Sequence, residues 1–313
     1  MQFLFIIDPL ESLKAYKDST VTMMREADKR GHAVSVCEQT SLAASRGGVE
    51  ARTMRISIRP GDEDWYTAGE TLVRTLASFD AVVMRKDPPF DLEYITSTWL
   101  LSAAERDGAL VINSPAAIRD HNEKLGILEF PQFNTPTLVT REAAQVHAFI
   151  EEHGDAILKR LDVMGGENIF RVRAEDPNRN VIVELMAQGG ARSVMAQRYL
   201  PAIKDGDKRI LLIDGKPVPH ALARIAKQGE SRANLAAGGR GVAQPLTAHD
   251  RTIAEALGPV LAARGLLLVG LDVIGEQLTE INVTSPTCAR EIQDQTGFDV
   301  GGMFMDALEA KQR

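Results

Sequence analysis

The sequence predicts a protein of mixed class, with an α/β region built on a doubly wound parallel sheet and an α+β region after it. Three observations predict this. Over the first third of the chain, short β-rich runs alternate with helical runs, which is typical of parallel strands joined by crossover helices. From about Lys124 onward, longer β-rich segments follow one another with few helices between them. A length of 313 residues corresponds to about two domains.

Capping and turn residues delimit the alternating elements. We expect a first helix between Asp18, a good N-cap residue, and Gly31, which follows two cations of the last turn. The other elements of this region are expected as strands 3–7, 33–37, 80–84 and 109–112 and helix 92–106. Ligands bind beyond the carboxyl ends of parallel strands, which points to Asp8, residues 85–87 and Asn113.

The second region is expected to contain mainly antiparallel strands. These are strands 156–160, 168–173, 193–200, 208–213 and 218–225. Asp214 and Gly215 are typical of a hairpin turn between the last two. A helix is expected over residues 247–264, with Thr247 as its N-cap and Gly265 just past its end.

Composition excludes several classes of protein. The 36 Lys and Arg residues face 43 Asp and Glu residues, and a net charge of −7 argues against electrostatic binding to nucleic acid or to an anionic membrane. Cys37 and Cys288 are far apart, without the spacing of a metal site or a disulfide framework. The apolar start reaches Asp8 too soon for a secretion signal, and no run approaches the roughly 18 apolar residues of a membrane helix. We therefore expect a cytoplasmic protein.

A hairpin over residues 266–286 is the most informative segment. Its period of two puts Glu280 and Asn282 on one face. A three-residue loop at 275–277 would put Asp272 directly opposite Glu280, whereas a two-residue loop would put the two carboxylates on opposite faces. In the first case, two carboxylates and an amide oxygen would form a site suited to Mg²⁺ or Mn²⁺. The alternative is a hairpin with one solvated face.

Three further segments allow either a ligand site or ordinary surface structure. Lys159 ends a strand and precedes Gly165 and Gly166, so the loop is either a phosphate-binding loop or a plain turn. It lacks the Walker form, which disfavours a P-loop NTPase. Residues 199–209 alternate Lys, Asp and Arg after an apolar strand end and are compatible with a solvated turn. Residues 229–241 form a glycine-rich linker or a lid that carries cations.

Taken together, these segments resemble the bacterial glutathione synthetase family of the ATP-grasp superfamily. The motifs that carry the resemblance are MRKDPPFD (84–91), RDHNEKL (119–125), YLPAIKDGDKR (199–209), NLAAGGRG (234–241) and VGLDVIG…LTEINVTSPTC (269–288). They are collinear from about residue 3 to residue 310. The resemblance implies a substrate-binding pre-ATP-grasp domain over residues 1–123 and an ATP-grasp domain over 124–309, with lobes of about 124–200 and 201–309. It also implies a homotetramer.

The resemblance implies ATP-dependent ligation of γ-glutamylcysteine to glycine, with ADP and phosphate as products. A carboxylate is a poor electrophile, so we expect its activation as an acyl phosphate that the glycine amine then attacks. Cations would stabilise the charge on the phosphoryl group, and no protein nucleophile is needed. This agrees with the lack of a Ser/His/Asp constellation in the sequence.

Site residues follow from the resemblance, motif by motif. ATP would contact Lys124, Lys159, Gly165, Gly166, the Tyr199 and Leu200 backbone, Lys204 and Asp207. Two Mg²⁺ ions, or Mn²⁺, would be held by Asp272, Glu280 and Asn282. The catalytic residues would be Arg209, Arg224, Asn234, Gly239 and Arg240. Arg85, Asp87, Ser285 and Thr287 would bind the other substrates, with Arg224, Ser285 and Thr287 near glycine. The phosphate loop departs from the family form KPLDGMGG at Arg160 and Val163.

Two other functions share part of this pattern. Another carboxylate–amine ligase of the superfamily, of the D-alanine–D-alanine or glutamate-adding type, would use the same chemistry with a different acceptor pocket. A non-catalytic ATP-binding regulatory protein would not need to retain both metal carboxylates, Asp272 and Glu280. A nicotinamide dehydrogenase is disfavoured because residues 8–11 lack the glycine fingerprint expected after the first strand.

Overall fold

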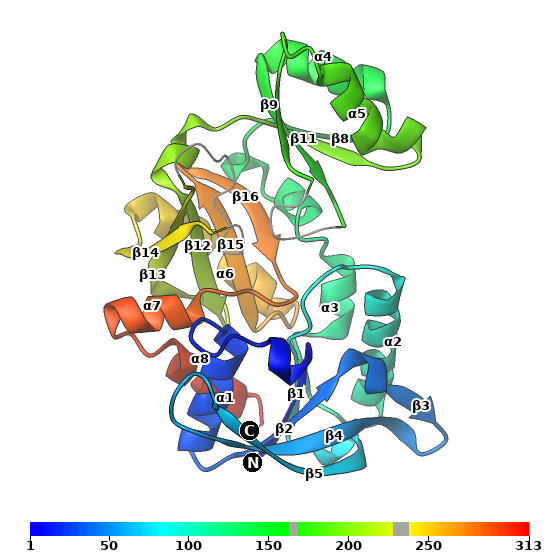
Figure 1. The fold of residues 1–313 in the computed structure, drawn as a ribbon, viewed down its shortest axis with the longest axis vertical. Coiled ribbons are helices and arrows are strands. Elements are labelled where there is room, and N and C mark those ends of the chain that lie inside the picture. Colours follow the sequence, from blue (N-terminus) through cyan, green and yellow to red (C-terminus); the bar gives the residue numbers. More distant parts are fainter. Residues whose placement is uncertain (163–167, 228–237, 313) are drawn as a thin grey trace.

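The computed structural model of the chain describes residues 1–162, 168–227 and 238–312. Its described strands form three sheets, of seven, four and five strands. Figure 1 shows the seven-stranded sheet at the bottom, the five-stranded sheet in the middle and the four-stranded sheet in a separate lobe at the top. Within the described residues, no helix is both long enough and apolar enough to cross a membrane.

The first sheet has the expected parallel strands at its centre. Its order is β3-β4-β2-β1-β6-β7, and β1 pairs in parallel with both β2 and β6. The parallel strands are β1 (Gln2–Ile7), β2 (Ala33–Glu38), β6 (Ala81–Met84) and β7 (Val111–Ile112), and the crossover helices are α1 (Ser19–Lys29) and α2 (Leu92–Arg106). The Asp18 side chain caps α1 by accepting from the Val21 N–H. The expected doubly wound arrangement is confirmed.

An antiparallel extension widens this sheet. It comprises β3 (Ala43–Ser45), β4 (Gly48–Ile58) and β5 (Tyr66–Thr75). β4 pairs antiparallel with β2, which makes the sheet mixed, and β5 pairs with β4. We assigned no element to residues 38–79 from the sequence. β5 has no buried residue along its length, so it lacks the apolar alternation by which a half-buried strand is recognised, whereas β4 alternates between buried and less buried positions and was missed despite that pattern.

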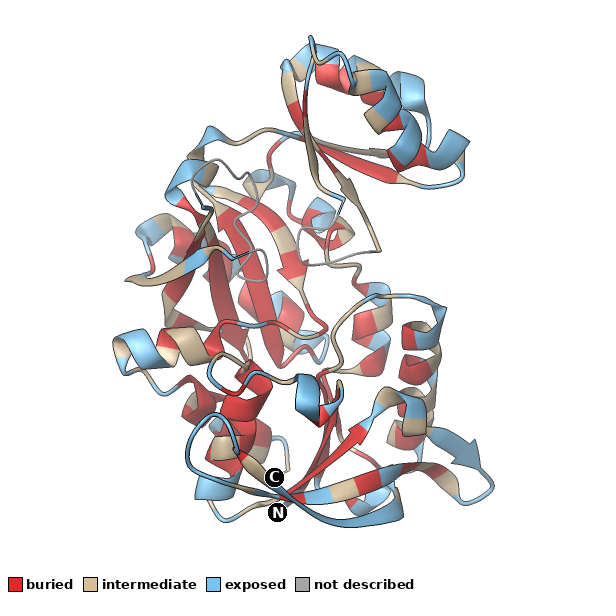
Figure 2. Ribbon diagram, in the orientation of Figure 1, coloured by how far each residue is buried: buried red, intermediate tan, exposed pale blue. Residues whose placement is uncertain are grey.

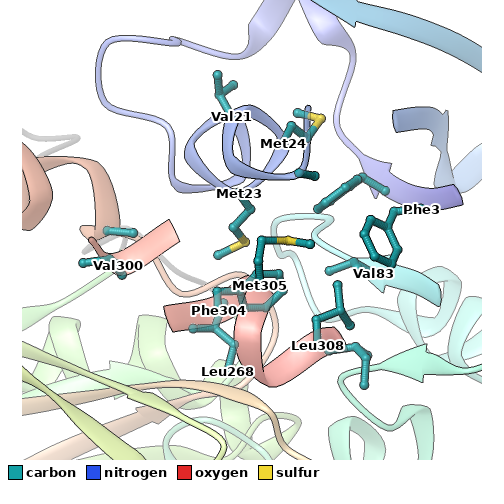
Figure 3. Close-up of a cluster of buried hydrophobic side chains, with 14 of the residues drawn as sticks. Phe3, Val21, Met23, Met24, Val83, Leu268, Val300, Phe304, Met305 and Leu308 are labelled. Carbon is teal, nitrogen blue, oxygen red and sulfur yellow. The ribbon is translucent and has the colours of Figure 1, made fainter. Parts of the chain in front are cut away.

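Alternate side chains of β1 contribute to two different cores. Phe3 and Phe5 pack with α1 on one face, whereas Leu4 and Ile6 pack with α2 residues on the other. The first core also includes residues of α8 (Val300–Ala310), which lies against α1. Figure 3 shows Met23 and Met24 of α1 beside Phe304, Met305 and Leu308 of α8. The last helix of the described chain therefore completes the core of the first domain.

The lobe at the top of Figure 1 is a small α+β unit with its own core. Its sheet has the order β10-β9-β11-β8, and two helices cover it. The elements are β8 (Thr137–Thr140), α4 (Ala143–His153), β9 (Asp155–Arg160), β10 (Phe170–Arg173), α5 (Arg179–Ala187) and β11 (Val194–Arg198). The three strands predicted in this region are confirmed, with shifted ends.

The five-stranded sheet carries most of the expected site. Its order is β14-β13-β12-β15-β16, all antiparallel, and its inner strands are buried (Figure 2). The strands are β12 (Asp207–Ile213), β13 (Lys216–Ile225), β14 (Arg240–Pro245), β15 (Leu268–Ile274) and β16 (Gln277–Asn282). Asp214 and Gly215 both have positive φ, which confirms the hairpin turn. The helix α6 (Ala248–Ala263) packs on β13, and Thr247 forms the expected N-terminal cap. Three more helices are α3 (Pro115–Asp120), α7 (Ala289–Thr296) and the 3-10 helix η4 (Leu125–Glu129).

Gly258 gives a stability prediction for this packing. A Cβ at Gly258 would lie 2.0 Å from the Gly215 carbonyl oxygen, so α6 could not keep its contact with the turn. We expect Gly258→Ala to lower the free energy of unfolding by about 1–3 kcal/mol, although alanine is the better helix former. Urea denaturation measures this. The control is Ala256→Ser on the exposed face of α6, which should stay within about 0.5 kcal/mol of the parent. Equal effects of the two substitutions would contradict the packing argument.

Candidate active site

The β15–β16 hairpin brings the two predicted metal carboxylates together by a route that we did not predict. Ile274 pairs with Gln277, so the loop has two residues, which is the alternative for which we expected the two carboxylates on opposite faces. A β-bulge at Thr279 then shifts the register, and Asp272 pairs with Glu280 after all. The Thr279 hydroxyl donates to the Asp272 carbonyl oxygen at 3.2 Å, which holds the bulge. The extra residue Thr279 therefore puts Asp272 and Glu280 on the same face of the hairpin, where the two-residue loop alone would have put them on opposite faces.

Two arginines from neighbouring strands bind Asp272. Arg209 lies opposite Asp272 in the β12–β15 register, and its Nη2 donates to Asp272 Oδ2 at 3.0 Å. Arg224 Nη2 lies 2.9 Å from the same Oδ2 and also donates to Asp207 Oδ2 at 2.5 Å. These three partners of the network come from β12, β13 and β15, and Asp272, Arg209 and Arg224 are each no more than 5% exposed. The arrangement therefore fixes both guanidinium groups at one end of the sheet.

The two carboxyl groups of this network respond oppositely to their surroundings. Burial alone would raise the pKa of Asp272, but the charges of Arg209 and Arg224 outweigh it and hold that pKa well below its usual range. Burial raises the pKa of Asp207 to about 6, because its single partner Arg224 does not compensate and the charge of Asp272 adds repulsion. Among the described residues, Asp207 Oδ1 is buried and has no hydrogen-bond partner.

The raised pKa of Asp207 gives a pH prediction. An aspartate has a pKa of about 3.9 in an unfolded chain, so between about pH 4 and 6 the folded state binds more protons at Asp207 than the unfolded state does. This group therefore lowers the free energy of unfolding as pH rises through that window. We expect Asp207→Asn to remove this decline, as measured by urea denaturation at several pH values against the exposed Asp205→Asn control. Parallel pH profiles of Asp207→Asn and the parent would contradict it.

Lysines from two other segments approach the same carboxylates. Lys124 Nζ lies 3.2 Å from Glu280 Oε1. Burial lowers the pKa of Lys159 on β9, and the charge of Glu280 acts in the opposite direction. Burial likewise raises the pKa of Glu123, and repulsion from Glu280 adds to the effect. Lys159 belongs to the four-stranded sheet and Glu280 to the five-stranded sheet, so these charges interact between the two sheets.

The predicted substrate residues lie where the parallel strands end. Arg85 follows β6, is 4% exposed, and donates to Thr20 Oγ1 and to the Pro286 carbonyl oxygen, both at 2.9 Å. Its Nη1 is buried without a partner among the described residues. Burial raises the pKa of Asp87, and a hydrogen bond with Ser285 opposes this. Arg85 and Asp87 thus meet the segment that follows β16, as the rule on strand ends predicts.

Sequence reasoning missed Glu291, which lies in the first turn of α7. Its Oε2 is buried without a partner in the described part of the chain. Burial raises its pKa; the charge of Lys17 opposes this effect, and the charges of Asp18 and Asp294 add to it. Asp18 also acts on Arg85, so both side chains border the N-terminus of α1. An acidic residue in the first turn of a helix commonly stabilises the helix by interacting with its dipole. The sequence position of Glu291 therefore gave no reason to predict a role in the site.

The remaining predicted site residues do not join the network around Asp272 or the group around Arg85. The Tyr199 N–H donates to the Asp155 carbonyl oxygen at 3.0 Å, and Arg171 stacks 3.6 Å over the Tyr199 ring. Asn282 Nδ2 donates to the Gly270 carbonyl oxygen at 3.2 Å. Exposed positions are Lys204, Arg240 and Thr287; partly buried ones are Leu200, Gly239 and Ser285. Gly165, Gly166 and Asn234, like Val163, lie outside the described residues. Arg160, where the family has proline, donates to Asp162 through two nitrogens.

Solved structures show which fold the chain has. D-cycloserine synthetase DcsG matches with a TM-score of 0.69 and 16% identity, covering 99% of this chain and 100% of that one. The ATP-grasp ligase PsnB, complexed with a minimal precursor, matches with a TM-score of 0.64 and 20% identity over 99% of each chain. At these identities the likeness concerns the fold. The chain has the fold of the ATP-grasp ligases.

Sequence comparisons define the family. The model described as prokaryotic glutathione synthetase, N-terminal domain, matches residues 1–119, and the model for the ATP-grasp domain of the same family matches residues 123–297. The glutathione synthetase of Ralstonia nicotianae is 58% identical over 309 residues, 99% of this chain and 95% of that protein. The enzyme of Nitrosomonas europaea is 58% identical over 312 residues, 99% and 98%. The chain belongs to the prokaryotic glutathione synthetase family.

Proposed function

We propose that this chain ligates γ-glutamylcysteine to glycine, with cleavage of ATP to ADP and phosphate. The observation that carries this proposal is 58% identity to glutathione synthetases over 99% of the chain. In the proposed sequence of steps, the cysteinyl carboxylate attacks the γ-phosphate to give an acyl phosphate. The glycine amine then attacks the acyl carbon, and phosphate leaves from the tetrahedral intermediate.

The network around Asp272 supports a role in charge stabilisation. Arg209 and Arg224 are held by a carboxylate whose low pKa keeps it ionised, so their guanidinium groups are oriented before substrate binds. We assign Lys124 and Lys159 to the ATP phosphates, together with Gly165 and Gly166. Asn234, Gly239 and Arg240 are assigned beside Arg209 and Arg224, around the transferred phosphoryl group. The Tyr199–Leu200 backbone is assigned to adenine, Asp207 to ribose, and Lys204 to the nucleotide.

The residues present fit a divalent metal ion. We propose that Asp272, Glu280 and Asn282 hold two Mg²⁺ ions, with Mn²⁺ as a substitute. Asp272 and Glu280 face each other in register, and Asn282 uses its Nδ2 to donate to Gly270, which leaves the amide oxygen as its accepting end. This all-oxygen set is the chemistry that such ions require. Within the described residues, no three Asp, Glu, His or Cys side chains form a metal site, and the proposed set contains two carboxylates and one amide. When bound, the metal neutralises charge on the phosphates.

Two unpartnered groups support the placement of the dipeptide. A γ-glutamyl group carries a free carboxylate and a free ammonium. Arg85 Nη1 is a buried donor without a described partner, and Glu291 Oε2 is a buried acceptor without one. We propose that they receive this carboxylate and ammonium, with Asp87 and Ser285 beside them. Ser285, Thr287 and Arg224 are assigned near glycine.

This placement predicts a selective effect of Glu291→Gln. The amide removes the negative charge that the ammonium would meet, so we expect the KM for γ-glutamylcysteine to rise about tenfold or more, with the KM for ATP nearly unchanged. Steady-state kinetics with each substrate varied in turn measure this. The control is Glu309→Gln. The Glu309 carboxylate binds Arg30 and His32 at the C-terminal end of α1, whereas Glu291 borders its N-terminal end. A KM for the dipeptide that stays at the parent value would exclude Glu291 from the site.

One assay tests the proposed function against the alternatives. ADP release is measured with γ-glutamylcysteine, with and without glycine, and with D-alanine and with glutamate in parallel. We expect full turnover only with the dipeptide, glycine and ATP together. Turnover with D-alanine or glutamate instead would identify another ligase of the superfamily, and ATP binding without turnover would identify a regulatory protein. Failure to trap an acyl phosphate with dipeptide and ATP would overturn the mechanism.

We further propose a cytoplasmic homotetramer with the domain division 1–123, 124–200 and 201–309. Exposed apolar residues support an assembly, since Leu92 and Trp99 on α2 are 66% and 54% exposed. Leu92 and Trp99 are about two helical turns apart, so they lie on the same face of α2, and the opposite face of this helix is buried in the domain. Sedimentation equilibrium tests the proposal, and a monomer at micromolar concentration would overturn it.

A further inference from the structure

Glu123 lies in the connection between α3 and η4, which runs along the open edge of the five-stranded sheet. β16 is the edge strand, because it pairs with β15 alone among the described strands. The Glu123 carbonyl oxygen accepts a hydrogen bond from the Ile281 N–H at 2.8 Å. The connection therefore continues the pairing of the sheet across β16, although it is not itself a strand.

The Glu123 side chain extends this contact past the end of β16. Its Oε1 accepts from the Val283 N–H at 2.9 Å, the Thr284 N–H at 3.0 Å and the Thr284 hydroxyl at 2.7 Å. β16 ends at Asn282, so these donors have no neighbouring strand on this side. A single carboxylate oxygen thus holds the chain where it leaves the sheet. Such charge-assisted bonds are stronger and more directional than neutral ones.

Glu123 also lies between the two halves of the site. On one side, the adjacent Lys124 pairs with Glu280 at 3.2 Å. On the other side, the chain passes from Thr284 to Ser285, which bonds Asp87, and to Pro286, whose carbonyl accepts from Arg85. The hydrogen bonds of Glu123 therefore set the distance between the lysine that we assign to the ATP phosphates and the segment that we assign to the dipeptide and glycine.

We propose that Glu123 is a positioning residue for the ligation. It fixes the segment 284–287 relative to Lys124 and Glu280, so that the dipeptide carboxylate and the γ-phosphate are held in one geometry. This inference rests on the proposed function for the roles of Lys124 and Ser285. The physical reason is that small displacements of reacting groups cost much of the benefit of proximity. Residues that only orient contacting residues typically contribute roughly 10–100-fold.

The test compares Glu123→Ala with Glu123→Gln. The alanine variant loses all three bonds, and we expect kcat to fall roughly 10–100-fold, with the KM for ATP nearly unchanged. The glutamine variant keeps an acceptor oxygen, and we expect it to recover to within about threefold of the parent. The control is Glu26→Ala, because Glu26 is a buried carboxylate of α1 that binds Lys29 and Arg30 far from β16. We expect it to lower thermal stability and leave both kinetic constants within about twofold.

A second measurement needs no substrate. Amide hydrogen exchange should be faster at Val283 and Thr284 in Glu123→Ala than in the parent, with exchange along β16 unchanged. Faster exchange without a fall in kcat would overturn the positioning role and leave the proposed function standing. A KM for ATP that rises as much as kcat falls, or a glutamine variant no better than alanine, would also overturn it. A parent protein that does not turn over the dipeptide with glycine would instead overturn the proposed function.

Discussion

Replacing Glu280 with glutamine abolishes metal-dependent turnover while the fold remains intact. Glu280 is one of only two carboxylates in the proposed metal set, and the neutral amide is a poor substitute for it. A loss of several kcal/mol of charge stabilisation corresponds to a fall in kcat of at least about 100-fold. ADP release at several Mg²⁺ concentrations measures the effect. Binding of Mn²⁺ by paramagnetic resonance, with and without nucleotide, reads out the metal separately from activity.

The matched control is Glu276→Gln in the turn of the same hairpin. Glu276 is exposed, and its substitution should leave both turnover and Mn²⁺ binding at the parent level. The thermal midpoints of the two variants should be similar, because Glu280 is a partly exposed residue whose described ion-pair partner is Lys124. Full activity of Glu280→Gln would remove Glu280 from the metal site, whatever its effect on stability.

Asp272→Asn destabilises the protein more than any other charge-neutralising substitution that we discuss. The change leaves the shape of the side chain intact but leaves Arg209 and Arg224 without their shared counter-ion in a buried site. Breaking a buried ion pair in this way costs about 3–5 kcal/mol. Urea denaturation at neutral pH measures it. Because the pKa of Asp272 is lowered on folding, this stabilisation is present above about pH 4 and is lost as pH falls further.

The control for Asp272 is Glu129→Gln. Glu129 binds Arg264 through two nitrogens, as Asp272 binds Arg209, but at the surface, where the side chains of Glu129 and Arg264 are 45% and 37% exposed. Exposed ion pairs contribute about 0–1 kcal/mol. Equal losses of stability in Asp272→Asn and Glu129→Gln would contradict the view that burial makes the Asp272 network costly to break.

Sequence patterns predict those elements whose periodicity reflects burial on one face. The helix α2 begins and ends at the predicted residues, Leu92 and Arg106, and the Asp214–Gly215 turn has the expected positive φ angles. β5 was not predicted, because its exposure leaves no periodic signal. The length of the loop at Gly275 and Glu276 stayed open, and the bulge at Thr279 was not predicted, for another reason. Loop length and bulge compensate for each other, and no local pattern separates a three-residue loop from a two-residue loop with a bulge at Thr279.

The residues of the candidate site also fall into two groups, those on paired strands and those placed only by contacts between distant parts of the chain. Arg209, Arg224, Asp272 and Glu280 lie on paired strands, and the pairing of these strands brings them together. The sequence grouped Arg209 and Arg224 with the two carboxylates only through the family resemblance. Glu123 and Glu291 act through tertiary contacts with residues distant in the sequence. A lone acidic residue in a connection or a first helical turn is ordinary at the surface. Only their burial in the folded chain distinguishes them.

The packing of α8 against α1 has a consequence for synthesis on the ribosome. Met23 and Met24 of α1 pack in one core with Phe304 and Met305, and 270 residues of chain separate the two helices. A nascent chain that has already released its first 123 residues still lacks the cover for this apolar surface. The parallel strands therefore emerge long before their partner does, and the first domain reaches its final packing only when the last helix has left the exit tunnel.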